Sequence, residues 1–238
     1  MAKCEMRVQY RQMRFIQTDD TKVGADALRD RLKQALYADK TALWLLSGGS
    51  NISDEATILG GLIEGGKTGK LTVMLMDERF GVVGHTDSNW QQLVEAGCDF
   101  TLVNAIPVMN HPEKSLEETV ADYARVVKQA MDAADIIIGQ FGLGADGHTA
   151  GILPDSPATS ETTKLVVGYS ASPFERITLT RHALARVDVA YVFAFGNAKS
   201  GALQDLRDGK KPFAHLPARL LGDISETYVY NDQIQERG

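Results

Sequence analysis

Apolar, β-branched runs alternate along the chain with segments of helical periodicity. Five runs have the length and composition of buried strands: TALWLL at 41–46, LTVMLM at 71–76, ADIIIGQF at 134–141, VDVAYVFAF at 187–195 and TYVYN at 227–231. Strands that are covered on both faces read as continuous apolar runs, and helices join them in parallel sheets. The pattern therefore predicts an α/β fold of three layers, in which helices cover both faces of a mainly parallel sheet.

The segments between these runs carry helical signals. Apolar residues recur at helical spacing over 23–36, and a Ser-x-x-Glu capping box opens a second predicted helix at 115–131. The stretch at 153–164 is rich in Pro, Ser and Thr, but it is too short to link two independent domains. We therefore expect residues 1–238 to form a single domain.

Composition narrows the possible partners. The 238 residues carry a net charge of -6 without a long Lys/Arg cluster, which argues against nucleic acid and anionic membranes. No apolar run approaches the roughly 20 residues that span a bilayer, and residues 1–15 lack the apolar core of a secretory signal, so we predict a cytoplasmic protein. Cys4 and Cys98 stand apart without metal-ligand spacing and are interpreted as thiols. A monomer is favoured, although the sequence does not fix the oligomeric state.

Four short polar segments directly follow predicted strands. They lie at 47–50, 77–79, 142–151 and 196–199, and they contain Gly, Ser, Asp, Arg, His and Lys. In open parallel sheets, ligands bind beyond the carboxyl ends of the strands. We therefore expect these four segments to form the functional site.

Two glycine patterns suggest nucleotides but lack the required context. Gly142, Gly144 and Gly147 match G-x-G-x-x-G, yet Pro154 interrupts the helix that should follow, and no acidic residue closes a second strand. The run at 61–68 matches a phosphate loop, but it ends a helix and leads into a strand, which is the reverse order. We therefore predict no nucleotide cofactor.

The loop at 142–151, GLGADGHTAG, combines glycines with an acid and an imidazole. Glycine lets backbone N–H groups approach a ligand, and a short helix predicted to start near His148 would add its positive end. The imidazole can move protons near neutral pH, with Asp146 either orienting it or holding the turn. The N–H groups around Gly144 and Gly147 are the expected donors to an oxyanion. In the alternative structural interpretation, His148 only caps the short helix.

Several segments together resemble the 6-phosphogluconolactonase family. The resemblance rests on ordered motifs over residues 47–199, with HLPARLL at 215–221 as a further match: SGGS at 47–50, DERFGVVGHTDSN at 77–89, GLGADGHTA at 142–150, PFERITLT at 173–180 and FGNAK at 195–199. It implies a Rossmann-like fold of the glucosamine-6-phosphate deaminase/ribose-5-phosphate isomerase type. It also implies hydrolysis of 6-phospho-D-glucono-1,5-lactone without a metal or cofactor.

The resemblance implies roles for particular residues. His148 would act as the general base that activates water, and Asp146 would assist it. A small phosphorylated lactone would be held by local cations and N–H groups, which the net charge of -6 makes necessary. The expected substrate-binding residues are Ser47, Gly48, Gly49, Asp77, Arg79, Gly144, Gly147, Arg176 and Lys199.

Differences from related families leave two alternatives open. Deaminases of amino-sugar phosphates follow the same loop with an F-N-E-P stretch, whereas this chain continues with Thr149–Pro154 and lacks that Glu. A sugar-phosphate sensor without catalysis is the second alternative. Asn51 and Ile52 stand where the lactonases usually have Thr-Pro, and the following Asp54 and Glu55 are expected on the outer face of a helix, where they complement its dipole.

The remaining histidines and one lysine pair carry weaker signals. His85 lies in the GHTDSN segment, where support of a loop, a sugar contact and a plain surface role all compete. His111, His182 and His215 have no comparable context, and Lys210 with its neighbour lies in a solvated turn. Two isolated histidines at 85 and 148 do not make a metal site without a third ligand.

Overall fold

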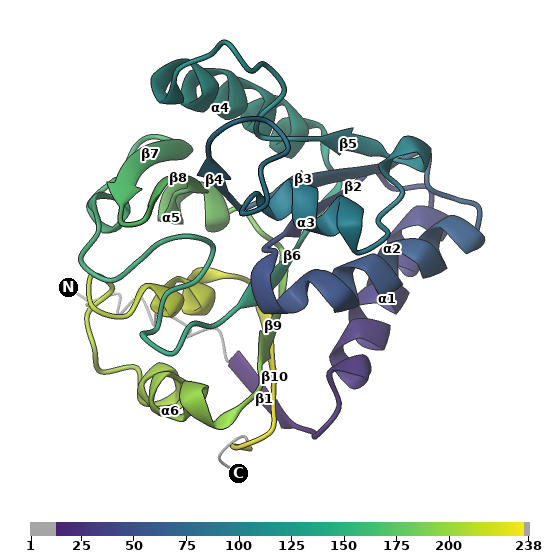
Figure 1. The fold of residues 1–238 in the computed structure, drawn as a ribbon. Helices are drawn as coiled ribbons and strands as arrows, with labels where there is room; N and C mark the ends of the chain where they lie inside the picture. The colour runs from purple at the N-terminus through teal and green to yellow at the C-terminus, as the bar shows by residue number, and fades with distance from the viewer. Residues whose placement is uncertain (1–12, 236–238) are drawn as a thin grey trace, which may run out of the picture.

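The computed structural model describes residues 13–235 and contains a seven-stranded parallel sheet and a three-stranded antiparallel sheet (Figure 1). The strands are β1 Met13–Gln17, β2 Ala42–Leu46, β3 Leu71–Leu75, β4 Asp77–Phe80, β5 Asn104–Ile106, β6 Ile136–Gly142, β7 Val166–Ala171, β8 Phe174–Leu179, β9 Val189–Ala194 and β10 Glu226–Asn231. The α-helices are α1 Thr21–Tyr37, α2 Ile52–Glu64, α3 Asn89–Glu95, α4 Leu116–Ala133, α5 Arg181–Leu184 and α6 Ser200–Asp208. Short 3₁₀ turns are η1 Gly49–Asn51, η2 Phe100–Leu102, η3 Pro157–Thr159, η4 Asn197–Lys199 and η5 Pro217–Asp223.

The large sheet confirms the predicted α/β architecture. Its strand order is β1-β10-β9-β6-β2-β3-β5, every pairing is parallel, and all five predicted strands are present. From β2 the chain proceeds to β3 and β5 on one side, whereas β6, β9 and β10 lie on the other. The direction of winding therefore reverses between β2 and β6, and a crevice opens at such a switch point.

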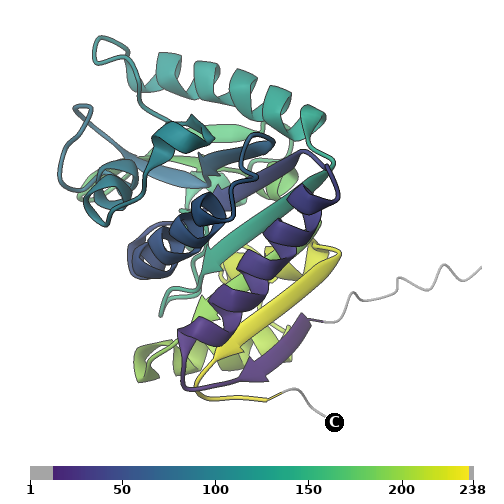
Figure 2. The same cartoon turned by 90° about the vertical axis from the view of Figure 1, so that its right-hand side faces the viewer.

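Helices cover the sheet because their apolar stripes face it. α1 and α2 lie on one face, while the small sheet, α4, α5 and the η5 segment lie toward the other (Figures 1 and 2). α4 begins with the predicted capping box at Ser115, and its Tyr123 hydroxyl donates to the Leu75 carbonyl at 2.6 Å. Gly24 allows α1 to approach β10, since a Cβ there would lie 2.8 Å from the Tyr230 ring. Trp44 is completely buried in the core between these layers.

The small antiparallel sheet was not expected as a separate unit. Its order is β4-β8-β7, and it places Arg79 directly opposite Arg176 in the register of β4 and β8. β4 is four residues long and polar, so its sequence lacks the apolar signal of a buried strand. The edge strands β1 and β5 of the large sheet also lie outside the predicted runs.

The predicted short helix near His148 is wrong. His148 has no regular secondary structure, and Ala150 and Gly151 form a turn between Thr149 and Ile152, which pair in an isolated antiparallel bridge. Ala150 and Gly151 have φ values of 49° and 70°, which lie in the left-handed region and cannot continue a right-handed helix. His148 is therefore held by a loop without a helix dipole behind it.

Other predictions fall partly outside the described residues. Cys98 is a free, buried thiol, which confirms its interpretation as a thiol. Cys4 lies outside the described residues. No helix within residues 13–235 is long and apolar enough to cross a membrane. The single domain over 1–238 stays a prediction.

Candidate active site

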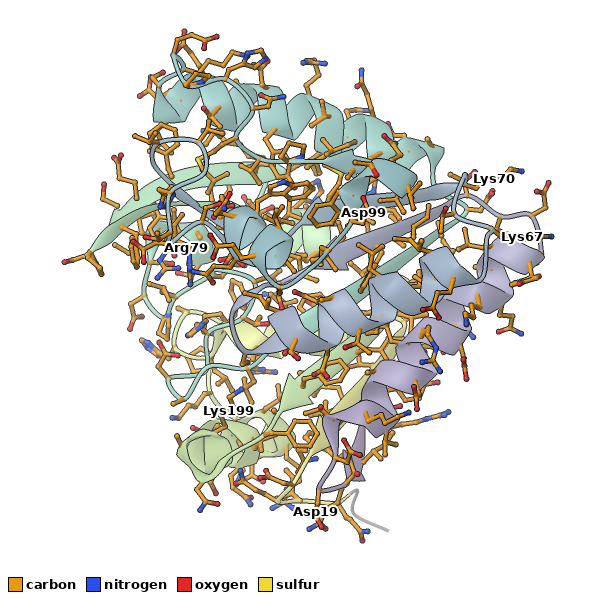
Figure 3. All side chains as sticks on the ribbon, turned by 45° about the vertical axis from the view of Figure 1, so that its right-hand side comes forward. Asp19, Lys67, Lys70, Arg79, Asp99 and Lys199 are labelled. Carbon is orange, nitrogen blue, oxygen red and sulfur yellow. The ribbon has the colours of Figure 1, made fainter. Side chains whose placement is uncertain are left out.

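The predicted segments meet in one cleft of about 300 Å³. They follow β9, β6, β2 and β3, which are consecutive neighbours in the large sheet, so their carboxyl ends open on the same edge. Figure 3 shows Arg79 and Lys199 on one side of the molecule, while Lys67 and Lys70 lie at the opposite ends of the strands. The cleft is lined by Ser47, Gly48, Gly49, Ser50, Asp77, Arg79, Asn89, Gly142, Leu143, Gly144, His148, Ala150, Gly151, Arg176 and Lys199.

His148 and Asp146 form a pair at this cleft. Nδ1 of His148 lies 2.6 Å from Oδ1 of Asp146, and the same oxygen accepts the backbone N–H of His148 at 3.1 Å. Burial acts to raise the pKa of Asp146, but the bonds and charge of His148 outweigh it and lower that pKa overall. A proton on Nδ1 satisfies the carboxylate, which leaves Nε2 as a base. Asp146 itself does not line the cleft.

The glycines of this loop shape the backbone around the imidazole. A Cβ at Gly144 would lie 2.1 Å from Nδ1 of His148, so a larger residue would displace the ring. Gly147 has a φ of 86° and faces the side chain of Leu216 behind the loop, away from the cleft lining. Gly144 therefore contributes to the cleft directly, and Gly147 only through the fold of the loop.

The predicted oxyanion donors need correction. The Gly144 N–H donates to the His148 carbonyl at 2.9 Å, and the Gly147 N–H donates to the Gly144 carbonyl at 3.0 Å. Both groups stabilise the turn, and neither is available to a ligand. The sequence could not reveal this, because the partners are carbonyls of the same short loop.

Two arginines come together across the small sheet. Arg79 and Arg176 face each other in register, and their guanidinium carbons lie 5.6 Å and 5.7 Å from the Phe174 ring centre. Nη1 of Arg79 donates to the Asp87 carbonyl at 2.7 Å, whereas both Nε groups are buried without a partner among the described residues. Both arginines line the cleft, and the Arg176 guanidinium makes no hydrogen bond within residues 13–235, so the pair retains donors for an anion there.

Asp77 is buried beside these arginines. Burial raises the pKa of Asp77 to about 6, against the lowering influence of Arg79 and Arg176. Gly151 makes room for this side chain, since a Cβ at that position would lie 2.4 Å from Cβ of Asp77. A carboxyl in this position can accept a hydrogen bond from a substrate hydroxyl.

Lys199 provides the third cation. It ends η4, and its Nζ lies 3.5 Å from the Ser50 hydroxyl, so it joins the segments that follow β9 and β2. Burial lowers the pKa of Lys199, and the nearby Asp232 opposes this effect. The ammonium group thus faces the same space as the glycine turn after β2.

The turn after β2 is stabilised by Asn51 and Glu55, which were not predicted as site residues. Gly48 and Gly49 have φ values of 69° and 60°, and Asn51 donates to the Ser47 hydroxyl at 2.8 Å. Glu55 is completely buried, so its predicted position on an outer helix face is wrong. The sequence did indicate that Glu55 is buried. It lies three, four and seven residues before the apolar residues of α2 at 58, 59 and 62, and residues at these spacings share one face of a helix.

Asn89 was missed. It is buried, its Nδ2 donates to the Asp77 carbonyl at 3.0 Å, and it packs against Gly48. Its place in the GHTDSN segment was the available signal. His85 of the same segment lies outside the cleft lining, and its Nε2 is 2.9 Å from the Arg79 carbonyl, so it supports the loop.

The described residues contain no group of three or more His, Cys, Asp or Glu side chains arranged to hold a metal ion. His111 pairs with Glu113 at 3.4 Å and His215 pairs with Asp155 at 2.7 Å, both at the surface. The chemistry that the cleft supports therefore combines an imidazole–carboxylate pair with three cations.

The fold and the cleft define an α/β protein with a cation-lined cleft at the carboxyl ends of a parallel sheet. Residues 18–229 match the family model described as glucosamine-6-phosphate isomerases/6-phosphogluconolactonase, and the chain belongs to this family.

Relatives with similar sequences are named 6-phosphogluconolactonase. The protein of Homo sapiens is 30% identical over 192 residues, which cover 74% of this chain and 72% of the relative. The protein of Mycobacterium leprae is 28% identical over 219 residues, which cover 83% and 86% of the two chains.

Solved structures confirm the fold. The 6-phosphogluconolactonase of Trypanosoma brucei has a TM-score of 0.75 at 18% identity, with 93% of this chain and 97% of that chain covered. A monomeric glucosamine-6-phosphate deaminase has a TM-score of 0.72 at 17% identity, with coverage of 93% and 98%. Because lactonases and deaminases share the architecture, the fold alone does not select the reaction.

Proposed function

We propose that this protein hydrolyses 6-phospho-D-glucono-1,5-lactone to 6-phospho-D-gluconate, the lactone step of the oxidative pentose phosphate pathway. The proposal is carried by one observation: the His148–Asp146 pair and three cations, Arg79, Arg176 and Lys199, serve the same cleft. The names of the related sequences support it.

In the proposed mechanism, His148 activates water. Nε2 takes a proton as the water oxygen attacks C1 of the lactone, while Asp146 orients the ring and stabilises the imidazolium that forms. The tetrahedral intermediate then collapses, the bond between C1 and the ring oxygen breaks, and His148 returns the proton to the departing oxygen. No covalent intermediate with the protein is needed, since a lactone is an ester already activated for attack.

The three cations are assigned to two different negative groups of the substrate, the phosphate and the developing oxyanion. The phosphate carries close to two negative charges near neutral pH, and Lys199 with the turn after β2 offers an ammonium group, hydroxyls and N–H groups for it. With the N–H groups of Gly144 and Gly147 committed to the loop, Arg79 and Arg176 are the donors that the cleft offers to the developing oxyanion.

The test supplies freshly generated 6-phosphogluconolactone and follows acid release against the spontaneous rate. His148→Ala should lower kcat by about 10²- to 10⁴-fold, the usual contribution of a positioned acid–base group. Full activity in the folded variant would remove His148 from the mechanism. Absence of turnover by the unaltered protein would refute the lactonase proposal.

Two control measurements separate the alternatives. Release of ammonia from glucosamine 6-phosphate would indicate a deaminase, and binding of 6-phosphogluconate without lactone turnover would indicate a sensor. The monomeric state and the cytoplasmic location stay predictions from the sequence. Sedimentation of the purified protein and fractionation of cells test them.

A further inference from the structure

Glu55 is a buried carboxyl group directly behind the cleft. Its Oε1 accepts the N–H of Ser47 at 2.9 Å and the N–H of Gly48 at 3.3 Å. Its Oε2 is buried and has no hydrogen-bond partner among the described residues. Both residues that Glu55 holds line the cleft, so this side chain fixes part of the cleft wall without touching a ligand.

The charges around Glu55 disfavour its ionised form. No ion pair among residues 13–235 includes Glu55, and the titratable groups that influence it are Asp54 on its own helix and Asp77 on β4. Glu55 in turn raises the pKa of the Cys98 thiol, which follows α3. Burial, reinforced by the two acids, raises the pKa of Glu55 to about 8 in spite of the two N–H bonds. Near neutral pH the group is therefore mostly an uncharged acid.

The turn that Glu55 supports is clamped from two sides. Glu55 holds the N–H of Gly48, and the Asn89 amide fills the space at its α-carbon, where a Cβ would lie 2.7 Å from Cγ of Asn89. An amide at position 55 would also supply an accepting oxygen. A carboxylate, in contrast, would place a negative charge behind the surface that faces an anionic substrate.

We propose that Glu55 is a positioning residue of the sugar-phosphate cleft: its carboxyl group, buried directly behind the cleft wall, fixes the Ser47–Gly48 backbone, and a negative charge on this group weakens binding of the anion. The inference rests on the proposed function for the identity of the anion. It deepens that function by adding control of affinity by pH.

The experiment measures the Kd of 6-phosphogluconate, the stable product, by calorimetry from pH 6.5 to 9.5. The unaltered protein is compared with Glu55→Gln, which keeps the acceptor and the shape but cannot ionise. The ratio of the two Kd values should be close to one at pH 6.5 and should rise to about ten at pH 9.5, as expected for one added charge near a partly solvated anion. Titration of the ligand phosphate, which is common to both measurements, cancels in this ratio.

Asp54→Asn is the matched control, because Asp54 is the adjacent acid of α2 and its carboxylate bonds the Thr21 hydroxyl away from the cleft. Its Kd should rise between pH 6.5 and 9.5 as that of the unaltered protein does, with the midpoint displaced only slightly, because Asp54 has the smaller influence of the two acids on Glu55. Glu55→Met removes the acceptor and should raise KM for the lactone at pH 7 by about tenfold, with a smaller change in kcat. Glu55→Gln should restore KM, and thermal unfolding verifies that each variant is folded.

If Glu55→Gln does not fold, calorimetry at pH 8 in buffers of different ionisation enthalpy replaces the ratio. It uses a protein with His148→Ala and Lys199→Ala, because the pKa of Lys199 is also lowered and an adjacent anion would raise it. Uptake of protons with 6-phosphogluconate supports the proposal, and no uptake overturns it. A flat ratio, or an equal effect of Asp54→Asn, also overturns it. Binding of 6-phosphogluconate without lactone turnover refutes the lactonase proposal alone, because the ratio still tests Glu55.

Discussion

Replacing Asp146 with Asn separates the charge of this residue from its geometry. Oδ1 of Asp146 accepts both the imidazole Nδ1–H and the backbone N–H of His148, so the carbonyl oxygen of Asn can keep both bonds. The substitution therefore removes the negative charge that stabilises the imidazolium and leaves the ring in place. Asp146→Ala removes both contributions.

The structure sets the expected size of the effect. The side chains of His148 and Asp146 are 42% and 53% exposed, so solvent screens most of their attraction. At a charge separation of about 3.5 Å and a nearly aqueous dielectric, the attraction is about 1–2 kcal/mol. Asp146→Asn should therefore lower kcat by about five- to thirtyfold with KM unchanged. Asp146→Ala, which also frees the ring, should lower kcat by about 10²-fold or more.

Initial rates of lactone hydrolysis at pH 7, with the spontaneous rate subtracted, measure both parameters. Asp155→Asn is the matched control, since Asp155 forms a similar exposed pair with His215 outside the cleft and should leave kcat unchanged. Equal kcat values for Asp146→Asn and the unaltered protein would show that the charge has no role. Equal losses of kcat in the Asn and Ala variants would show that the orientation of the ring by Asp146 has no role.

Three further predictions concern the cleft and the charge behind it. Lys199→Ala should raise KM for the lactone by about tenfold or more and change kcat less, because the ammonium group is assigned to binding. Gly144→Ala should lower kcat by at least about 10²-fold, since its Cβ would collide with Nδ1 of His148. A pKa of Glu55 that is raised from 4.5 to about 8 means that the folded protein binds the extra proton, so its stability should fall as pH rises from about 4.5 to 8. Glu55→Gln should remove up to about 5 kcal/mol of that loss, seen as a smaller decrease of Tm.

Each of these predictions has its own control in the chain. Lys210→Ala alters an exposed lysine outside the cleft, and Gly60→Ala adds a Cβ where nothing lies within 4 Å. Neither should change KM or kcat. The Asp54→Asn protein should show the same decrease of Tm between pH 6 and 8 as the unaltered protein. An unchanged KM in Lys199→Ala, an active Gly144→Ala enzyme, or parallel Tm curves for Glu55→Gln and the unaltered protein would each contradict the assignment concerned.

The sequence by itself determined the sheet, the main helices and the segments that meet at the cleft. Continuous apolar runs cannot be exposed on either face, so the five central strands follow from composition, and parallel connections then place the segments after them at one edge. His148, Lys199 and the turn at 47–50 were predictable for this reason.

Tertiary structure decided what depends on contacts between distant or irregular segments. Arg176 meets Arg79 through the pairing of β8 with β4, which no local pattern signals. The N–H groups of Gly144 and Gly147 turn to carbonyls of their own loop, so a glycine-rich sequence alone does not define an oxyanion site. Packing removes Glu55 from water and thereby raises the pKa of its carboxyl group, whereas the sequence shows that a carboxyl group is present but not whether it is exposed to solvent.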